Sequence, residues 1–199
     1  MLLLHYILQP IILLFIVMDP LGNSPLFYVL TKDLDRKERR NIVNYSVFVA
    51  TIILLIFALV GDIVMNYLGV TTSDFKIAAG LVLLTYSILG FLEARPAPRY
   101  DRTSLAIVPL ATPLLAGPGA IASVIYIKYT WGLYVAILST IVASAISLPI
   151  LHMGQFLDRV LGKNGTLILD KIMMLLMAAF AISIIRSGIL DILHYILHY

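Results

Sequence analysis

Six long apolar stretches occupy most of the chain and restrict what it can fold into. Each is long enough for a helix that crosses the hydrocarbon core of a bilayer, which takes about 20 residues. Hydrophobic residues make up 61% of the chain and charged residues 13%, about half the charged share of an average soluble domain. The chain is therefore expected to be an integral membrane protein. The stretches cover residues 2–30, 42–68, 75–93, 104–129, 132–157 and 167–193.

The secondary structure expected of these stretches follows from their solvent. Lipid offers backbone N–H and C=O groups no partners, so a spanning segment has to be a helix or part of a closed barrel. The stretches lack the period-two alternation of barrel strands. We expect an all-α polytopic membrane protein with six transmembrane helices in a single domain, residues 1–199. The first helix is expected to be retained, because its apolar run from Leu2 lacks the basic start and the cleavage site of a signal peptide.

Lysine and arginine residues predict how the chain lies in the membrane. Polar clusters at residues 31–40, 95–102 and 158–165, together with Lys171, hold 11 of the 14 basic residues. With six spans, all of these lie on one side, and basic loops face the cytoplasm. The expected location is the plasma (inner) membrane, with both termini outside and three cytoplasmic loops.

Two of the stretches carry the same interruption. The run 19–25 contains two prolines five residues apart, and the run 112–118 contains two more at the same spacing. The two runs are 93 residues apart, and three helices fall in each half of the chain. An odd number of helices inverts the second half relative to the first. The pattern predicts an inverted-topology repeat of residues 1–93 and 104–199, as in many secondary transporters, with the first and fourth helices broken in mid-membrane.

Proline and glycine predict the local structure of each interruption. The leading proline of each pair lacks a backbone donor, so it ends or kinks the helix before it. The second proline suits the first position of a new helix. The new half-helices are therefore expected to start at Pro25 and Pro118, with Asn23 or Ser24 capping the first and Gly117 capping the second.

Each break predicts a binding site, because it leaves backbone groups without partners in the membrane; a purely structural kink is the plainer alternative. The N–H groups at the start of a half-helix carry partial positive charge and attract a carboxylate. The carbonyl groups that end the preceding segment, with the amide of Asn23, suit an ammonium group. Two facing breaks therefore suit a small zwitterion. The expected substrate-binding residues are Gly22, Asn23, Ser24, Pro25, Ala116, Gly117, Pro118 and Gly119.

Asp19 lies beside the first break, far from either expected membrane surface. Three roles fit it: a carrier of a coupling cation, a partner of a substrate ammonium group, or a hydrogen-bond acceptor that holds the break in shape. Its counterpart in the repeat, Thr112, is neutral, so the two halves are expected to differ chemically here. His152, in the fifth stretch, is expected to form a hydrogen bond between helices, with a proton relay as the alternative.

The two interruptions resemble the signature segments of the MarC family of inner-membrane proteins, which includes the SnatA-type neutral amino-acid transporters. The length and the six-span layout are similar too. The resemblance implies a secondary transporter of small neutral amino acids such as glycine and alanine, coupled to a proton or sodium ion and needing no other cofactor. The matching runs are Asp19-Pro20-Leu21-Gly22-Asn23-Ser24-Pro25-Leu26-Phe27 and Pro113-Leu114-Leu115-Ala116-Gly117-Pro118-Gly119-Ala120-Ile121.

Other classes of function compete with transport. A passive channel or exporter for small polar solutes is the main alternative, because facing half-helices suit a pore equally well. Catalysis is not expected, since the chain has no cysteine and no nucleophile elbow, zinc helix or P-loop. Neither a metal site nor a nucleic-acid partner is expected. The expected partners are a small neutral amino acid and the lipid bilayer, and the oligomeric state is left open.

Overall fold

The computed structural model describes residues 2–31, 34–92 and 115–197, and these residues form helices and no strand. Five segments of them are long and apolar enough to cross a membrane. The expected all-α architecture is therefore confirmed for the described residues. The expected span 104–129 lies partly outside the described residues, so the number of six spans stays a prediction. The helices are α1 (Leu2–Met18), α2 (Pro20–Thr31), α3 (Arg36–Leu68), α4 (Thr72–Leu92), α6 (Pro118–Trp131), α7 (Leu133–His152) and α8 (Gly154–Leu197).

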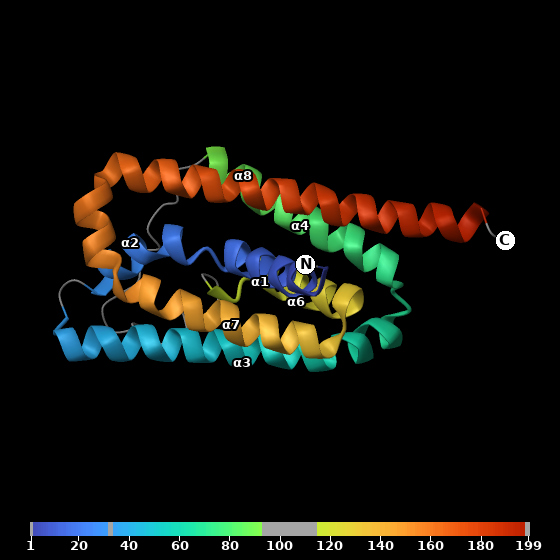
Figure 1. The fold of residues 1–199 in the computed structure, drawn as a ribbon, viewed down its shortest axis with the longest axis horizontal. Coiled ribbons are helices and arrows are strands. Elements are labelled where there is room, and N and C mark those ends of the chain that lie inside the picture. The colour runs from blue at the N-terminus through green and yellow to red at the C-terminus, as the bar shows by residue number, and fades with distance from the viewer. Residues whose placement is uncertain (1, 32–33, 93–114, 198–199) are drawn as a thin grey trace.

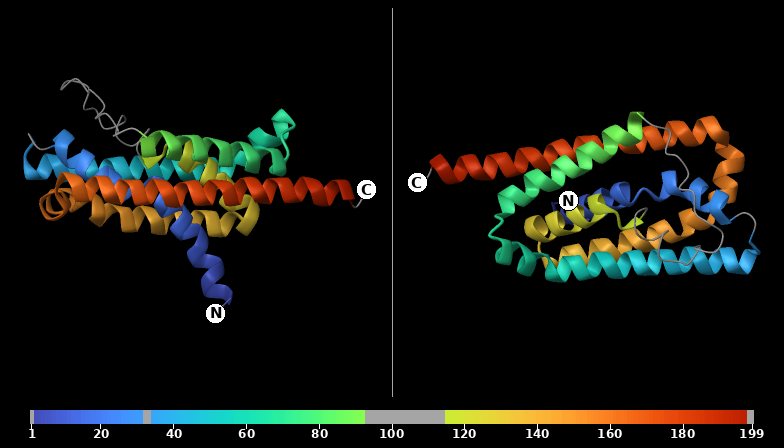
Figure 2. Two further views of the ribbon diagram at one scale, coloured as in Figure 1. Left: turned by 90° about the horizontal axis from the view of Figure 1, so that it is seen from above. Right: turned by 180° about the vertical axis from the view of Figure 1, so that it is seen from behind.

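The helices form two outer pairs with the shorter helices between them. α3 packs against α7, and α4 packs against α8 (Figure 1). α1, α2 and α6 lie between these pairs, and α1 leans out of the bundle toward its N-terminus (Figure 2). Each outer pair joins helices that the predicted repeat relates. The repeat itself stays a prediction, because its second half begins outside the described residues.

The connection between α2 and α3 is shorter than predicted. A polar connection is expected over residues 31–40, whereas α3 already begins at Arg36. Asp35 and Glu38 explain the early start, because they cap the helix reciprocally. Glu38 N–H donates to Asp35 Oδ1 at 2.7 Å, and Asp35 N–H donates to Glu38 Oε2 at 3.3 Å. The basic residues of this cluster therefore stand on the first turns of a helix.

The polar connection predicted at residues 158–165 is also mostly helical. α8 begins directly after Met153 and departs from helical geometry at Gly162, where φ is 61°. Figure 1 shows the chain turning sharply in this orange region before the long C-terminal part of α8. Because glycine adopts positive φ without steric cost, the chain turns here without a loop.

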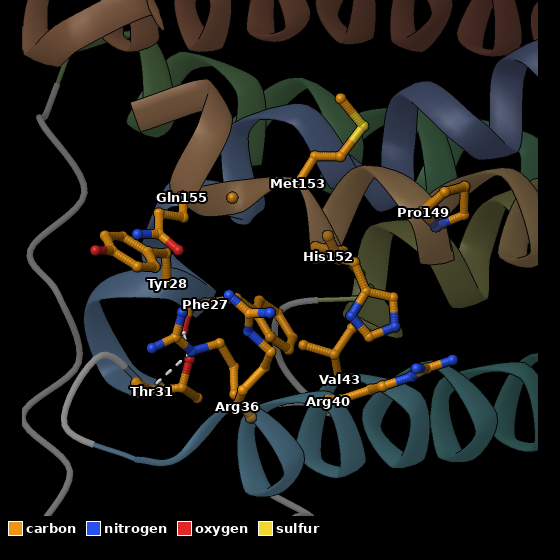
Figure 3. A pocket seen from close by; sticks show the side chains of 13 residues that line it. Phe27, Tyr28, Thr31, Arg36, Arg40, Val43, Pro149, His152, Met153 and Gln155 are labelled. Atoms are coloured by element: carbon orange, nitrogen blue, oxygen red, sulfur yellow. Dashed lines mark hydrogen bonds between the residues drawn. The ribbon is translucent and has the colours of Figure 1, made fainter. Parts of the chain in front are cut away.

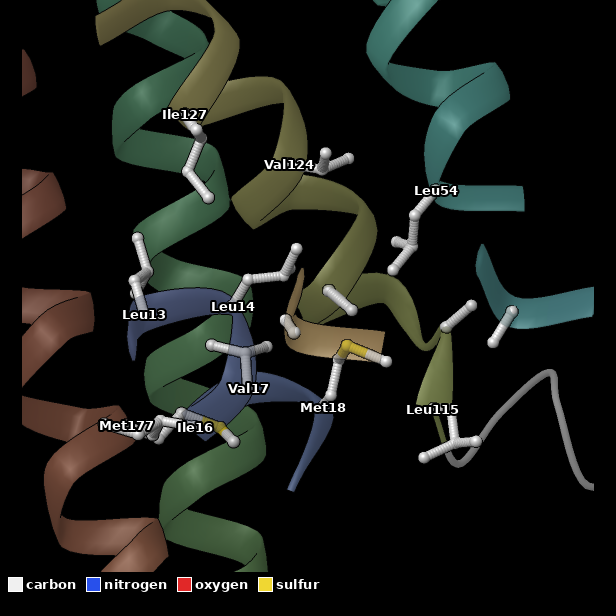
Figure 4. Close-up of a cluster of buried hydrophobic side chains, with 14 of the residues drawn as sticks. Leu13, Leu14, Ile16, Val17, Met18, Leu54, Leu115, Val124, Ile127 and Met177 are labelled. Carbon is white, nitrogen blue, oxygen red and sulfur yellow. The ribbon is translucent and has the colours of Figure 1, made fainter. Parts of the chain in front are cut away.

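Apolar side chains from the central helices and their neighbours fill the interior. They come from α1, α2, α3, α4, α6, α7 and α8, and from the chain just before α6. On the outer faces, large apolar side chains such as Ile63 and Leu175 are exposed, as a lipid-facing surface requires. This packing buries Met18 beside the first break and Leu115 at the second. Figure 4 labels Leu13, Leu14, Ile16, Val17, Met18, Leu54, Leu115, Val124, Ile127 and Met177 in the cluster.

Basic residues gather at one end of the bundle. Arg36 lies at the start of α3 and Arg159 lies near the start of α8, and both residues line one cavity. At the opposite end, Lys76 forms an ion pair with Asp191 at 2.6 Å. Which end faces the cytoplasm stays a prediction.

Candidate functional site

The first break is a helix cap built by Asp19. Its φ of 46° is a left-handed conformation that aspartate adopts more readily than most residues. Asp19 Oδ1 accepts a hydrogen bond from Gly22 N–H at 3.1 Å, which satisfies one of the open donors at the start of α2. Pro20 takes the first helical position, where a missing N–H does no harm. Asp19 is 1% exposed, so the cap lies inside the protein.

The first half-helix starts five residues earlier than predicted, at Pro20 rather than at Pro25. The prediction that Asn23 or Ser24 caps this helix is therefore wrong, since both lie inside α2, as does Pro25. Either proline suits the first position of a helix. Asp19 decides between them, because its side chain caps the earlier start.

Asn23 and Ser24 instead tie the first break to its surroundings. Asn23 Nδ2 donates to the carbonyl of Met18, the last residue of α1, at 3.0 Å. Ser24 Oγ donates to the carbonyl of Ile150 in α7 at 2.9 Å. The carbonyl of Met18, which was expected to be open to an ammonium group, thus already has a donor within the protein.

The second break has the predicted cap residue but no carboxylate. α6 begins at Pro118 with Gly117 in the cap position, as expected, and no side chain caps the helix. The N-terminal partial positive charge of α6 is therefore not offset by a side chain of the cap. Thr112 and Pro113, which lead into this break, lie outside the described residues.

The structure brings the two breaks together. Gly119 of α6 packs on Val17, two residues before the first break, and a Cβ on Gly119 would lie 3.5 Å from Val17 Cγ1. Met18, just before the first break, and Leu115, within the second, share one buried cluster (Figure 4). Of the predicted residues at the second break, Ala116 and Gly119 are buried, Gly117 is half-buried and Pro118 is exposed.

A second acidic residue, Asp170 of α8, reaches the first break. Asp19 Oδ2 and Asp170 Oδ1 lie 2.5 and 2.6 Å from the point that a Cβ on Gly22 would occupy. Both carboxylates thus face one point on α2, and a glycine there leaves room for them. Asp170 Oδ1 is buried and has no hydrogen-bond partner in the described part of the chain. Two carboxylates so placed repel each other unless a proton or a cation lies between them.

Asp170 is absent from the site residues predicted from the sequence. The available signal was its position as an acid inside the apolar stretch 167–193, since ionisable groups within spans are commonly functional. Its partnership with Asp19 depends on the packing of α2 against α8, which no local pattern encodes.

A cavity of about 600 Å³ lies at the basic end of the bundle. None of the predicted substrate-binding residues whose side chains the structure describes lines it. One of its lining residues, Gly154, packs on the first break, because a Cβ on Gly154 would lie 2.5 Å from Ser24 O. His152 also lines the cavity, and its Nε2 lies 2.8 Å from Asn44 Oδ1 of α3. The hydrogen bond predicted between helices at His152 is therefore confirmed.

Comparisons with known proteins place the chain among membrane proteins of similar length. It is 34% identical over 199 residues to the UPF0056 membrane protein MJ1677 of Methanocaldococcus jannaschii, covering 94% of this chain and 97% of that protein. It is 31% identical over 190 residues to a UPF0056 membrane protein of Archaeoglobus fulgidus, covering 89% of each. It is 26% identical over 198 residues to the UPF0056 membrane protein YvbG of Bacillus subtilis, covering 92% and 94%.

No solved structure matches the chain. The sequence profile of the MarC family integral membrane proteins matches residues 4–193, which include both helix breaks and Asp170. The chain belongs to the MarC family of integral membrane proteins.

Proposed function

We propose that this protein is a secondary transporter of small neutral amino acids, with its substrate bound between the two helix breaks. The observation that carries the proposal is the meeting of two unlike helix ends. The buried carboxylate of Asp19 lies at one break, and a helix N-terminus without a side-chain cap lies at the other. The ammonium and carboxylate groups of an amino acid match these two ends in charge.

The substrate carboxylate is assigned to the start of α6. At the start of α2, the carboxylate of Asp19 already accepts a backbone N–H, so that end is not an anion site. At the start of α6, the first N–H groups after Pro118 belong to Gly119 and Ala120, and no side chain caps them. Gly117 is half-buried and has no side chain to keep a ligand from the backbone, which favours the smallest amino acids.

The substrate ammonium group is assigned to Asp19, and the coupling cation to the pair of Asp19 and Asp170. Carboxylates in the protein interior favour positive charge beside them. In this proposal a proton or sodium ion binds between the two side chains, and the substrate ammonium group binds Asp19. Binding of substrate and cation therefore depend on each other, which is the basis of coupled transport.

Alternating access requires the site to be closed on one side at a time. Asp19, Asn23 and Ser24 are buried in this structure. The hydrogen bond from Ser24 to Ile150, with the contact of Gly154, closes α2 against the junction of α7 and α8. These contacts have to separate for the first break to reach solvent at that end.

Uptake by purified protein in liposomes tests the proposal. Labelled glycine or alanine should accumulate saturably when a proton or sodium gradient is imposed, and unlabelled alanine should compete. Asp191→Asn is the control for substitutions of Asp19 and Asp170, because Asp191 is an exposed acid at the far end of α8. The absence of uptake under either gradient, from protein that stays monodisperse, would exclude the proposal. Flux that neither saturates nor needs a gradient would indicate a channel instead.

A further inference from the structure

A basic cavity lies apart from the two breaks, at the end of the bundle where α3 and α8 begin. Its volume is about 600 Å³, and a second cavity of about 410 Å³ shares Arg36, His152, Met153 and Gln155 with it. Figure 3 shows the residues of α2, α3, α7 and the start of α8 that line this space. Four helices thus contribute to one concave surface.

The two cavities are lined by positive charge. The arginines are Arg36, Arg39 and Arg40 of α3 and Arg159 of α8. None of the described residues that line either cavity is acidic. The guanidinium groups of Arg36, Arg40 and Arg159 form no hydrogen bond or ion pair with another described residue. Within the described part of the chain, their donors are therefore open to a ligand.

Arg39 differs from the other three arginines, because its side chain already contacts residues of α2. Its Nε donates to the carbonyl of Thr31 at 3.3 Å (dashed in Figure 3). Its guanidinium carbon lies 5.1 Å from the centre of the Tyr28 ring, within the range of a cation–π contact. These contacts join the end of α2 to the start of α3 and so fix one wall of the cavity.

The lining favours a phosphate group as the ligand. A guanidinium group pairs with phosphate through two parallel N–H···O bonds, and arginine is the residue best suited to this geometry. Apolar side chains stand beside the charged ones: Phe156 lines the second cavity, and both Phe156 and Val160 of α8 are exposed. Basic pockets between membrane helices with apolar surface beside them are typical of sites for anionic lipid head groups.

We propose that this cavity binds a phosphate group, and that the head group of an anionic phospholipid is its main source. The basic residues at this end then have a role beyond the orientation of the chain in the membrane. A soluble phosphate compound offers the same chemistry and is the alternative source. The proposal does not depend on transport, because it concerns none of the residues assigned to the substrate.

Native mass spectrometry of the full chain in detergent tests the lipid source. Phosphatidylglycerol should remain bound in preference to phosphatidylcholine with the same acyl chains. Arg40→Gln combined with Arg159→Gln should reduce this preference about tenfold or more, because charge-assisted hydrogen bonds are lost. Arg159→Gln alone should reduce it less, and this variant keeps the test usable if the double variant does not fold. Arg186→Gln, an exposed arginine far along α8, is the matched control.

Thermal unfolding of the delipidated protein with inorganic phosphate tests the soluble source. Stabilisation by phosphate that the double variant loses would assign a soluble ligand to the same site. Preference for phosphatidylglycerol without stabilisation by phosphate would assign the lipid. Equal retention of the two lipids by the unmodified protein, with no effect of phosphate, would overturn the proposal. An equal loss of preference in Arg186→Gln would also overturn it, since the effect would then reflect total charge.

Discussion

At the first helix break a carboxylate caps the new helix, whereas at the second break the cap is a glycine. Asp19 supplies its own acceptor to the start of α2, and Asn23 supplies a donor to the end of α1. α6 has no such side chain at Gly117. One break is therefore capped by a side chain, and the other has a glycine cap that offers no side chain.

This difference shows that two breaks with the same proline spacing need not have the same chemistry. The first break contributes the carboxylate of Asp19, with that of Asp170 beside it. The second contributes the positive end of a helix dipole. A symmetric pair would suit two identical ions, whereas this unlike pair suits one molecule with two opposite charges.

The largest expected effect is that of Asp19→Asn. Asparagine also adopts positive φ readily and caps helices, so the fold of the break should survive. The negative charge is lost, and removal of one member of a buried charge pair is expected to reduce uptake on the order of 100-fold. Liposome uptake of glycine measures the effect, and thermal unfolding checks the fold. Unchanged uptake would mean that Asp19 acts only as a helix cap and does not bind the substrate.

Gly117→Asp should make the second break resemble the first. Gly117 has a φ of −71°, which any residue adopts, so an aspartate fits the backbone and caps α6. Its carboxylate would compete with that of the substrate, and affinity for glycine should fall about 30-fold. Gly117→Ala, which adds no charge, is the control and should retain most of the affinity. An equal loss in both variants would mean that space rather than charge matters here.

Asp170→Asn should separate binding from coupling. Gradient-driven uptake should fall about tenfold, because the coupling cation loses one of its two carboxylates. Exchange of labelled for unlabelled glycine, with no gradient imposed, should be less affected. Transport assays in both modes on the same liposomes make the comparison. A loss of the same size in both modes would assign Asp170 to the substrate instead.

Ser24→Ala should have the smallest effect. It removes the hydrogen bond from α2 to the carbonyl of Ile150, which contributes about 1 kcal/mol to stability. Thermal unfolding in detergent should show a small decrease in melting temperature. Ser147→Ala is the matched control, because Ser147 Oγ bonds within its own helix to Ala143. If Ser147→Ala lowers the melting temperature as much as Ser24→Ala, the hydrogen bond between α2 and α7 contributes no more than one within a helix.

The breaks could be predicted from the sequence because proline and glycine act locally. A missing N–H or a missing side chain limits the backbone whatever the surroundings, and both cap residues lie within the predicted runs. The prediction that α2 starts at Pro25 was wrong, since Pro20 suits the first position of a helix equally well. That choice depended on the side chain of Asp19, whose hydrogen bond to Gly22 appears only in the folded chain.

Long-range contacts set the limit of prediction from the sequence. Asp170 joins the first break through the packing of α8 on α2, about 150 residues further along the chain. The polar run at 158–165 is typical of a loop, yet it is helical except at Gly162. Polar residues near the end of a bundle can stand on a helix, because water is within reach there.

Ligand-induced stabilisation of the purified protein tests the central claim most directly. Glycine should raise the melting temperature, whereas methylamine, which lacks the carboxylate, and acetate, which lacks the ammonium group, should not. This result would show that one molecule has to satisfy both helix breaks at once. Equal stabilisation by acetate and glycine, or by methylamine and glycine, would contradict the account, because one break would then suffice for binding.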